Sequence, residues 1–267
     1  MFSEQFAIKP GKKILLKNIS TNNTFGQKKD EYEKTLEGNI KRMYELQHLM
    51  YAEDKHAILI VLQGMDTSGK DSTIMHVMRG MSPTGCNATS FKEPTPEELD
   101  HDFLWRVHKA VPRIGEFGIF NRSHYEDVIV PNAHKTITKT VLENRYRQIN
   151  DFEEMLTENG TVLLKFFLHI SRDEQKKRLL ERVNDPEKNW KMDPADLKER
   201  ALWDRYQKAT EEALEKCSTA RAPWYVIPAD KKWARNLAVS RIIVDKLDSL
   251  DMKYPNVKYS KKDMVIV

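Results

Sequence analysis

Hydrophobic and polar positions follow two different periods along the chain. Apolar residues at 36, 40, 43, 46 and 50 recur at helical spacing and predict an amphipathic helix over about 30–52. Short continuous apolar runs, which are typical of strands buried on both faces of a parallel sheet, follow at 56–62, 116–120, 161–170 and 224–227. A weaker run at 86–91 brings the expected number of strands to about five.

Helical stretches fill the intervals between these runs. Thr95, Pro96 and Glu98 supply a capping hydroxyl, a proline at the first helical position and a capping glutamate, and predict one helix over 95–111. Further helices are expected at 138–158, from 171 onward, and at 194–216 and 232–250. Strands that alternate with such helices indicate a doubly wound α/β sheet, because parallel neighbours need a crossover that covers one face.

The pattern predicts one domain preceded by a short arm. Residues 1–30 mix Lys, Asn, Thr and Gly without sustained periodicity and are expected to form an extended N-terminal arm. A single domain is expected over 31–267, since no internal repeat or Gly/Ser linker divides that range. With 267 residues, of which 40% are hydrophobic, the chain is long enough to bury a large core.

Charge and cysteine content exclude several classes of protein. Lys and Arg number 44 and Asp and Glu number 40, and the resulting net charge of +4 is too small to indicate a nucleic-acid binder. Cys86 and Cys217 are too few for a disulfide framework and lack metal-ligand spacing, which indicates a reduced, cytoplasmic setting. No secretory signal opens the chain and no apolar run approaches the roughly 20 residues that span a bilayer, so no membrane partner is expected.

The first predicted strand runs into a phosphate-binding pattern. Residues 64–70 have the form Gly-x-x-x-x-Gly-Lys between a strand and a helix. Gly64 and Gly69 let successive backbone N–H groups turn inward around phosphate oxygens, and Lys70 reaches the outer phosphates. The remaining loop residues expected to contact phosphate are Met65, Thr67 and Ser68. The alternative is an ordinary strand-to-helix turn.

The residue after the lysine departs from the usual pattern. A Ser or Thr commonly binds Mg²⁺ there, and this chain has Asp71. Carboxylates or phosphate oxygens are therefore expected to hold the metal. Asp66 is the first candidate, because a carboxylate within the loop would repel phosphate unless a cation lay between them. The alternative for Asp66 is an Asx turn that stabilises the loop.

A second charged group follows the strand at 116–120. Arg122, Glu126 and Asp127 lie where the carboxyl edge of the sheet should place polar groups beside the phosphate loop. A kinase-type site needs a guanidinium that takes up phosphoryl charge and carboxylates that hold Mg²⁺, and these residues supply both. The alternative is a helix start whose acidic residues favour the helix dipole. His124 has no partner at ligand spacing and is expected to serve packing or hydrogen bonding.

A basic helix leads into a polar break. Lys176, Lys177, Arg178 and Arg182 follow residue 171, and the polar segment 183–196 comes next. In phosphate-transferring α/β enzymes such a break can act as a lid that brings arginines over the transferring group and excludes water. The alternative for each basic residue is a solvated helix face.

Five blocks of the sequence together resemble a known family. They are GMDTSGKD at 64–71, SFKEPTPEELDHDFLWRVHKAVP at 90–112, GIFNRSHYEDV at 118–128, NDPEKNWKMDPADL at 184–197 and APWYVIPADKKWAR at 222–235. In these blocks and in their order the chain resembles the polyphosphate kinase 2 family, and within it the class III members, over about residues 36–250.

The resemblance implies a P-loop kinase fold with a helical lid. Such an enzyme moves a terminal phosphoryl group between inorganic polyphosphate and a nucleotide with Mg²⁺, or with Mn²⁺ in its place. Class III members act on AMP as well as ADP and form ATP in two steps. Asn121 stands where many members have Asp, which resembles class III and shifts the expected metal carboxylates to Glu126 and Asp127.

The motifs and the resemblance together assign the site residues. The expected catalytic residues are Asp66, Lys70, Arg122, Asp127 and Arg182. Nucleotide or phosphate is expected to bind Gly64, Met65, Thr67, Ser68, Gly69, Asp71, Glu126, Arg178 and Asp196. The expected metal ligands are Asp66, Glu126 and Asp127.

A polyanionic donor also needs a basic track that leads away from the site. Candidates on or near the helix predicted over 95–111 are Lys92, Arg106, Lys109 and Arg113. Their alternative is an ordinary solvated face.

Two other functions share parts of this evidence. One is a nucleoside monophosphate kinase that uses ATP as donor. The other is a nucleotide-dependent switch or a nucleic-acid-binding protein, against which the near-neutral charge balance and the lack of interleaved aromatic and basic residues speak. The expected partners are polyphosphate, AMP, ADP and ATP, without nucleic acid, in a homo-oligomer that is a dimer or a tetramer.

Overall fold

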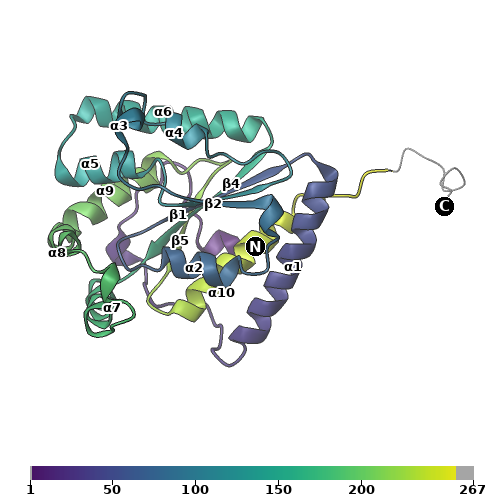
Figure 1. The fold of residues 1–267 in the computed structure, drawn as a ribbon, viewed down its shortest axis with the longest axis horizontal. Helices are drawn as coiled ribbons and strands as arrows, with labels where there is room; N and C mark the ends of the chain where they lie inside the picture. The colour runs from purple at the N-terminus through teal and green to yellow at the C-terminus, as the bar shows by residue number, and fades with distance from the viewer. Residues whose placement is uncertain (1, 257–267) are drawn as a thin grey trace, which may run out of the picture.

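A single parallel sheet forms the centre of the protein. The computed structural model describes residues 2–256 and orders the five strands of the sheet as β2-β3-β1-β4-β5 (Figure 1). The strands are β1 Ala57–Gln63, β2 Cys86–Ser90, β3 Phe117–Asn121, β4 Thr161–His169 and β5 Trp224–Pro228. The predicted five-stranded, doubly wound α/β sheet is thereby confirmed. Of the predicted arm and domain, residues 1 and 257–267 lie outside the described range.

Helices flank this sheet along most of the described chain. They are α1 Tyr32–Glu53, α2 Lys70–Val77, α3 Pro96–Leu99, α4 Trp105–His108, α5 Glu126–His134, α6 Lys139–Glu158, α7 Arg172–Asn184, α8 Pro194–Ala201, α9 Trp203–Lys216 and α10 Lys232–Asp248. Short 3-10 turns are η1 Phe2–Gln5, η2 Leu16–Asn18, η3 Pro83–Gly85 and η4 Asn189–Lys191. No helix within residues 2–256 is both long and apolar enough to cross a membrane.

The apolar strands separate two hydrophobic layers. Along β1, Ile58 and Ile60 pack into the layer beneath α1, α2 and α10, whereas Leu59 and Val61 pack into the layer beneath α5, α6 and α9. Figure 1 shows these two groups of helices on opposite faces of the sheet. Because both faces are covered, the continuous apolar runs are explained by burial on both sides.

Two predicted helices are each divided in the structure. The helix expected over 95–111 consists of α3 and α4, separated where the Asp102 side chain accepts a hydrogen bond from Leu104 N and turns the chain. The Thr95 capping box is nevertheless present. The helix expected over 194–216 consists of α8, which has no buried side chain, and α9, which begins at the buried Trp203 and packs on α5. Both predictions of one continuous helix are therefore wrong.

Helix α5 forms with a proline in its interior. Pro131 lacks the N–H that would bond to the Asp127 carbonyl four residues earlier. That carbonyl accepts a hydrogen bond from Arg145 Nη1 at 2.6 Å instead. The arginine on α6 thus satisfies the backbone group that the proline leaves open.

The N-terminal residues cover one edge of the sheet. Ile8 N donates to Trp224 O at 2.8 Å, Val226 N donates to Phe6 O at 2.9 Å, and Ala7 bridges antiparallel to Tyr225. Since β5 is an edge strand, this short antiparallel pairing occupies backbone groups that would otherwise be open to another strand.

The buried Phe6 side chain should anchor this segment. It is 3% exposed and lies against the rings of Phe2 and Phe25, with centroids at 5.0 and 4.4 Å. We expect Phe6→Ala to lower the free energy of unfolding in urea by about 3 kcal/mol. Leu15→Ala, at a side chain that is 49% exposed, should change it by less than about 0.5 kcal/mol. Equal losses in both variants would contradict the anchoring role.

Candidate active site

The phosphate loop, residues 64–69, joins the carboxyl end of β1 to α2. Gly64 (φ +153°) and Gly69 (φ +101°) have backbone conformations that other residues rarely adopt. A Cβ atom on Gly64 would lie 2.8 Å from Leu168 O, and one on Gly69 would overlap the guanidinium of Arg235. Both positions therefore require glycine for the close approach as well as for the turn.

Two buried arginines hold the loop from behind. Arg178 on α7 donates to Thr67 O at 2.9 Å and to Ser68 O at 3.2 Å, while Arg235 on α10 donates to Ser68 O at 3.0 Å. Arg178 was expected to contact phosphate, but its guanidinium bonds to loop carbonyls. Arg235 was not predicted, although it lies on the face of α10 that carries the apolar Ala238 and Val239, where a buried guanidinium signals a specific partner. Burial and the neighbouring Arg178 lower the pKa of Arg235 to about 9.

The hydroxyl groups of the loop lack protein partners. Among the described residues, Thr67 Oγ1 and Ser68 Oγ are buried and bond to no protein atom. Buried polar atoms need a partner, and phosphate oxygens are strong acceptors. The Met65 side chain, in contrast, packs against the apolar layer under α5 and α9. The loop therefore fits an anion at Thr67, which lines the cleft described below, whereas Ser68 is fully buried outside that lining and Met65 is anchored in the core.

Lys70 lies at the first position of α2 with its ammonium group turned back to the loop. Its Nζ atom donates to Gly64 O at 2.8 Å, and the residue is 9% exposed. Burial lowers the pKa of Lys70, and the nearby Arg122 lowers it further, whereas Asp66 and Glu126 oppose this change. The ammonium group thus belongs to one cluster with these three side chains.

Arg122 connects the two predicted carboxylates. Its Nη2 atom lies 3.0 Å from Asp66 Oδ1, and its Nη1 atom lies 3.7 Å from Glu126 Oε2. Burial alone would lower the pKa of Arg122, but Glu126, Asp66 and Asp196 outweigh it and raise the value. Burial raises the pKa of Glu126. With φ at +61°, Arg122 is also a non-glycine residue in the left-handed region, as is typical of functional sites.

Asp127 faces away from this cluster. Its Oδ2 atom lies 3.6 Å from Nη2 of Arg106, a guanidinium only 7% exposed that also donates to Lys92 O. Burial raises the pKa of Asp127, and the charges that oppose this rise are Arg106, Arg145 and His124. The structure therefore brings Glu126, and not Asp127, to Asp66 and Arg122, in contrast to the sequence-based expectation for both carboxylates.

Asp71 and Asn121 are paired with each other. Asn121 Nδ2 donates to Asp71 Oδ1 at 2.5 Å, and both residues line the cleft described below. The two positions at which the sequence departs from common patterns are thus in direct contact. The amide orients the carboxylate that stands in place of the usual hydroxyl.

A wide, charged cleft opens in front of the loop. Its volume is about 930 Å³, and it is bounded by the loop, β3, α7 and the segment between α7 and α8. Arg182 on α7 and Asp196 on α8 lie 3.7 Å apart across this segment, and burial together with the Asp66 charge raises the pKa of Asp196. Lining residues that were not predicted include Lys188, Trp190, Lys191, Lys232 and Arg235.

A smaller cavity lies beside the same cluster. It has a volume of about 200 Å³ and shares Asp66 and Arg122 with the cleft. Ile129, Val130 and Phe167 form its apolar part, and Tyr206 donates to Glu199 Oε2 at 2.5 Å at its rim. Asp66 and Arg122 therefore have access to two separate spaces.

The carboxylates fit a divalent metal that arrives together with phosphate. No group of three or more His, Cys, Asp or Glu side chains within residues 2–256 is arranged to hold a metal by itself. Small hard cations are often bound by one or two carboxylates plus substrate phosphates. Asp66 and Glu126, which meet at Arg122, supply such a pair.

Comparison with known proteins decides the family. Residues 26–255 match the family Polyphosphate kinase 2. The chain belongs to the polyphosphate kinase 2 family. This confirms the resemblance in the sequence at the level of the family.

Similar proteins of this family span almost the same length. The AMP/ADP-polyphosphate phosphotransferase of Meiothermus ruber is 53% identical over 226 residues, which cover 85% of each protein. The ADP-polyphosphate phosphotransferase of Rhodopseudomonas palustris is 41% identical over 97% of this chain and 94% of that protein. A crystal structure of polyphosphate kinase 2 from Arthrobacter aurescens TC1 matches with a TM-score of 0.90 and 42% identity, over 97% of this chain and 95% of that one.

The four candidates for a polyphosphate track do not lie together. Lys92 lines the cleft, whereas Arg106 is buried against Asp127. Lys109 lies with its Nζ atom 3.9 Å from the centre of the Trp105 ring. Arg113 bonds to Glu116 just before β3, at the end of the sheet opposite the phosphate loop. In this polyphosphate kinase 2 family member, Lys92 is the candidate that the structure brings to the cleft.

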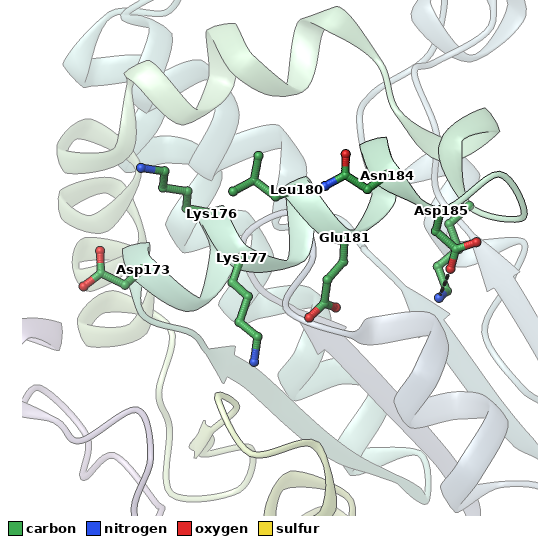
Figure 2. A pocket seen from close by; sticks show the side chains of 8 residues that line it. Asp173, Lys176, Lys177, Leu180, Glu181, Asn184 and Asp185 are labelled. Atoms are coloured by element: carbon green, nitrogen blue, oxygen red, sulfur yellow. Dashed lines mark hydrogen bonds and ion pairs between the residues drawn. The ribbon is translucent and has the colours of Figure 1, made fainter.

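Helix α7 divides its basic residues between two environments. Arg178 and Arg182 face the loop and the cleft, whereas Lys176 and Lys177 line a shallow depression on the outer side of the helix. Figure 2 shows this depression, in which the acidic side chains of Asp173, Glu181 and Asp185 lie among the lysines. Charges of both signs balance there, so the outer face is an ordinary solvated surface.

The close approach at Gly69 makes a specific prediction. We expect Gly69→Ala to reduce phosphate-dependent activity by about a hundredfold or more, because the methyl group displaces Arg235 and distorts the loop at positive φ. Circular dichroism should still report a folded protein. The control is Gly38→Ala in α1, where a Cβ meets no atom within 4 Å and full activity should remain. Full activity in Gly69→Ala would refute the packing argument.

Proposed function

We propose that this enzyme transfers the terminal phosphoryl group of inorganic polyphosphate to AMP and ADP, reversibly, forming ADP and ATP. The observation that carries the proposal is the cluster of Lys70, Arg122, Asp66 and Glu126 at the junction of two spaces. Membership of the polyphosphate kinase 2 family and the names of the relatives support polyphosphate as the donor.

The two spaces suit a reaction between two phosphate compounds. Phosphoryl transfer needs the attacking and leaving oxygens roughly in line with the moving group. Because Asp66 and Arg122 border both the cleft and the smaller cavity, donor and acceptor can approach the cluster from different sides. The chain thereby supplies positioning, which is the main requirement of this chemistry.

Cationic side chains stabilise the charge that develops on the moving group. Lys70 acts as a point charge on the outer phosphate oxygens, while Arg122 offers a planar guanidinium with several donors. Arg182, held near Asp196, would approach when the segment between α7 and α8 closes over the cleft and excludes water. We propose this segment as the lid.

Mg²⁺, or Mn²⁺ in its place, would be held by Asp66 and Glu126. When bound, the metal neutralises phosphate charge and orients the phosphate oxygens. Asp127 has a different role in this proposal, since it neutralises the buried Arg106. Asp71, oriented by Asn121, remains close enough to the cleft to bind metal-bound water.

The finer assignments follow the same reasoning. We propose class III specificity, that is, use of AMP as well as ADP, because the relative from Meiothermus ruber carries both nucleotides in its name. We also propose a homo-oligomer, dimer or tetramer, that works in the cytoplasm without nucleic acid. The free thiols of Cys86 and Cys217 suit such reducing surroundings.

The decisive experiment is incubation with AMP, Mg²⁺ and polyphosphate, followed by chromatography of ADP and ATP. Formation of both products is expected. Replacement of polyphosphate by ATP tests the alternative of an ATP-dependent monophosphate kinase. An enzyme that phosphorylates AMP only with ATP, or not at all, would overturn the proposal.

Loss of the phosphate-loop ammonium should remove this activity. We expect Lys70→Ala to lower the rate by about a hundredfold or more, because the charge that contacts the transferring phosphate is lost. Lys176→Ala, on the outer side of α7, should retain the rate within about twofold. Retention of more than about a tenth of the rate in Lys70→Ala would argue against its assigned contact.

Titration of the reaction rate with Mg²⁺ can distinguish the roles of Glu126 and Asp127. We expect Glu126→Gln to raise the Mg²⁺ concentration for half-maximal rate by about tenfold. Asp127→Asn should leave that concentration unchanged and lower only thermal stability, because it removes one of the two carboxylate charges beside the buried Arg106 and leaves Glu98 as the other. An increased Mg²⁺ requirement in Asp127→Asn alone would return the metal to Asp127.

A further inference from the structure

A buried polar network lies directly behind the segment that carries Arg122 and Glu126. Lys165 in the middle of β4 donates to Glu153 Oε2 at 2.5 Å and to the Cys217 carbonyl at 2.6 Å. Lys165 is 0% exposed and Glu153 is 1% exposed. Neither side chain borders the cleft or the smaller cavity, so the reaction does not use this ion pair directly.

The network reaches the site through two consecutive residues. Tyr125 donates its hydroxyl hydrogen to Glu153 Oε1 at 2.8 Å and accepts from Lys165 at 3.1 Å. His124 Nε2 lies 3.2 Å from the same Glu153 oxygen, and its Nδ1 atom has no protein partner among the described residues, which places the proton on Nε2. Both side chains are fully buried.

The residue before them is anchored as well. Ser123 Oγ accepts from Gln63 Nε2 at 3.1 Å and from Tyr125 N at 3.2 Å. The three residues between Arg122 and Glu126 are thus each tied to a buried group. Arg122, in its left-handed conformation, joins the end of β3 to this anchored segment.

A buried ion pair often adds little to the stability of the fold, because the desolvation of both charges offsets their attraction. Apolar residues of similar volume often give equal stability. Burial alone would raise the pKa of Glu153, but Lys165 and His124 outweigh it and lower the value, so the carboxylate is charged. A charged group with three defined partners fixes geometry more closely than apolar contacts do. The position of this network therefore points to orientation of the site.

We propose that Glu153 and Lys165 are positioning residues for phosphoryl transfer, which hold Arg122 and Glu126 at the phosphate loop through His124 and Tyr125. The inference rests on the proposed role of Arg122 in the reaction. It explains why charged side chains from α6 and β4 are buried behind the start of α5.

A double-mutant cycle tests this inference. Tyr125→Phe removes only the hydroxyl group that joins the network to the segment, and should lower kcat about tenfold while each KM stays within about twofold. In an Arg122→Lys background, the same substitution should lower kcat by less than about twofold, because its effect passes through Arg122. Equal factors in both backgrounds, or no loss in Tyr125→Phe, would overturn the proposal.

A second variant and a control complete the design. Glu153→Gln, if this variant folds, should also lower kcat less in the Arg122→Lys background than in the wild-type background. If Glu153→Gln does not fold, the result for Tyr125→Phe alone decides whether the proposal holds. Leu142→Ala, a core substitution on α6 remote from the network, should lower thermal stability but keep kcat within about twofold. The cycle uses whichever donor supports the wild-type reaction, so its outcome is separate from the identity of the donor.

Discussion

The site depends on two buried guanidinium groups that bind the carbonyls of the phosphate loop. Arg178 donates to four carbonyls, of Thr67, Ser68, Ala229 and Asp230, and Arg235 donates to Ser68 O. In a planar trans peptide the carbonyl and the following N–H point in opposite directions. The bond at Ser68 O therefore turns the Gly69 N–H away from the Arg235 guanidinium. Both arginines also add positive potential behind the loop, which favours phosphate.

The helix that carries Arg178 also serves the cleft. One turn further along α7, Arg182 meets Asp196 on α8. Because Arg178 fixes the inner face of α7 to the loop, the proposed lid between α7 and α8 begins at a helix that is held in place. In the proposed lid, Arg182 would approach and withdraw while the loop keeps its shape.

Much of this arrangement was predictable because it is local in sequence. The strand, the two glycines and Lys70 lie within residues 57–70, and Arg122 and Glu126 are only four residues apart. Arg235 was not predictable in the same way, since its contact with Ser68 depends on how α10 packs. The roles of Glu126 and Asp127 depend on the rotation of α5, because adjacent helical residues point about 100° apart. One of them faces Arg122 and the other Arg106, and composition alone does not distinguish them.

The pairing of Ala7 with Tyr225 has a consequence for synthesis of the protein. The segment around Ala7 leaves the ribosome well before the strand it covers, because Tyr225 follows almost the whole length of the described chain later. Contacts of such sequence separation form slowly and late in folding. The edge of β5 can therefore pair with the segment around Ala7 only after β5 itself has been synthesised. Until then, the backbone groups of that segment lack their partner strand. Docking of this segment is therefore expected to follow the assembly of the sheet.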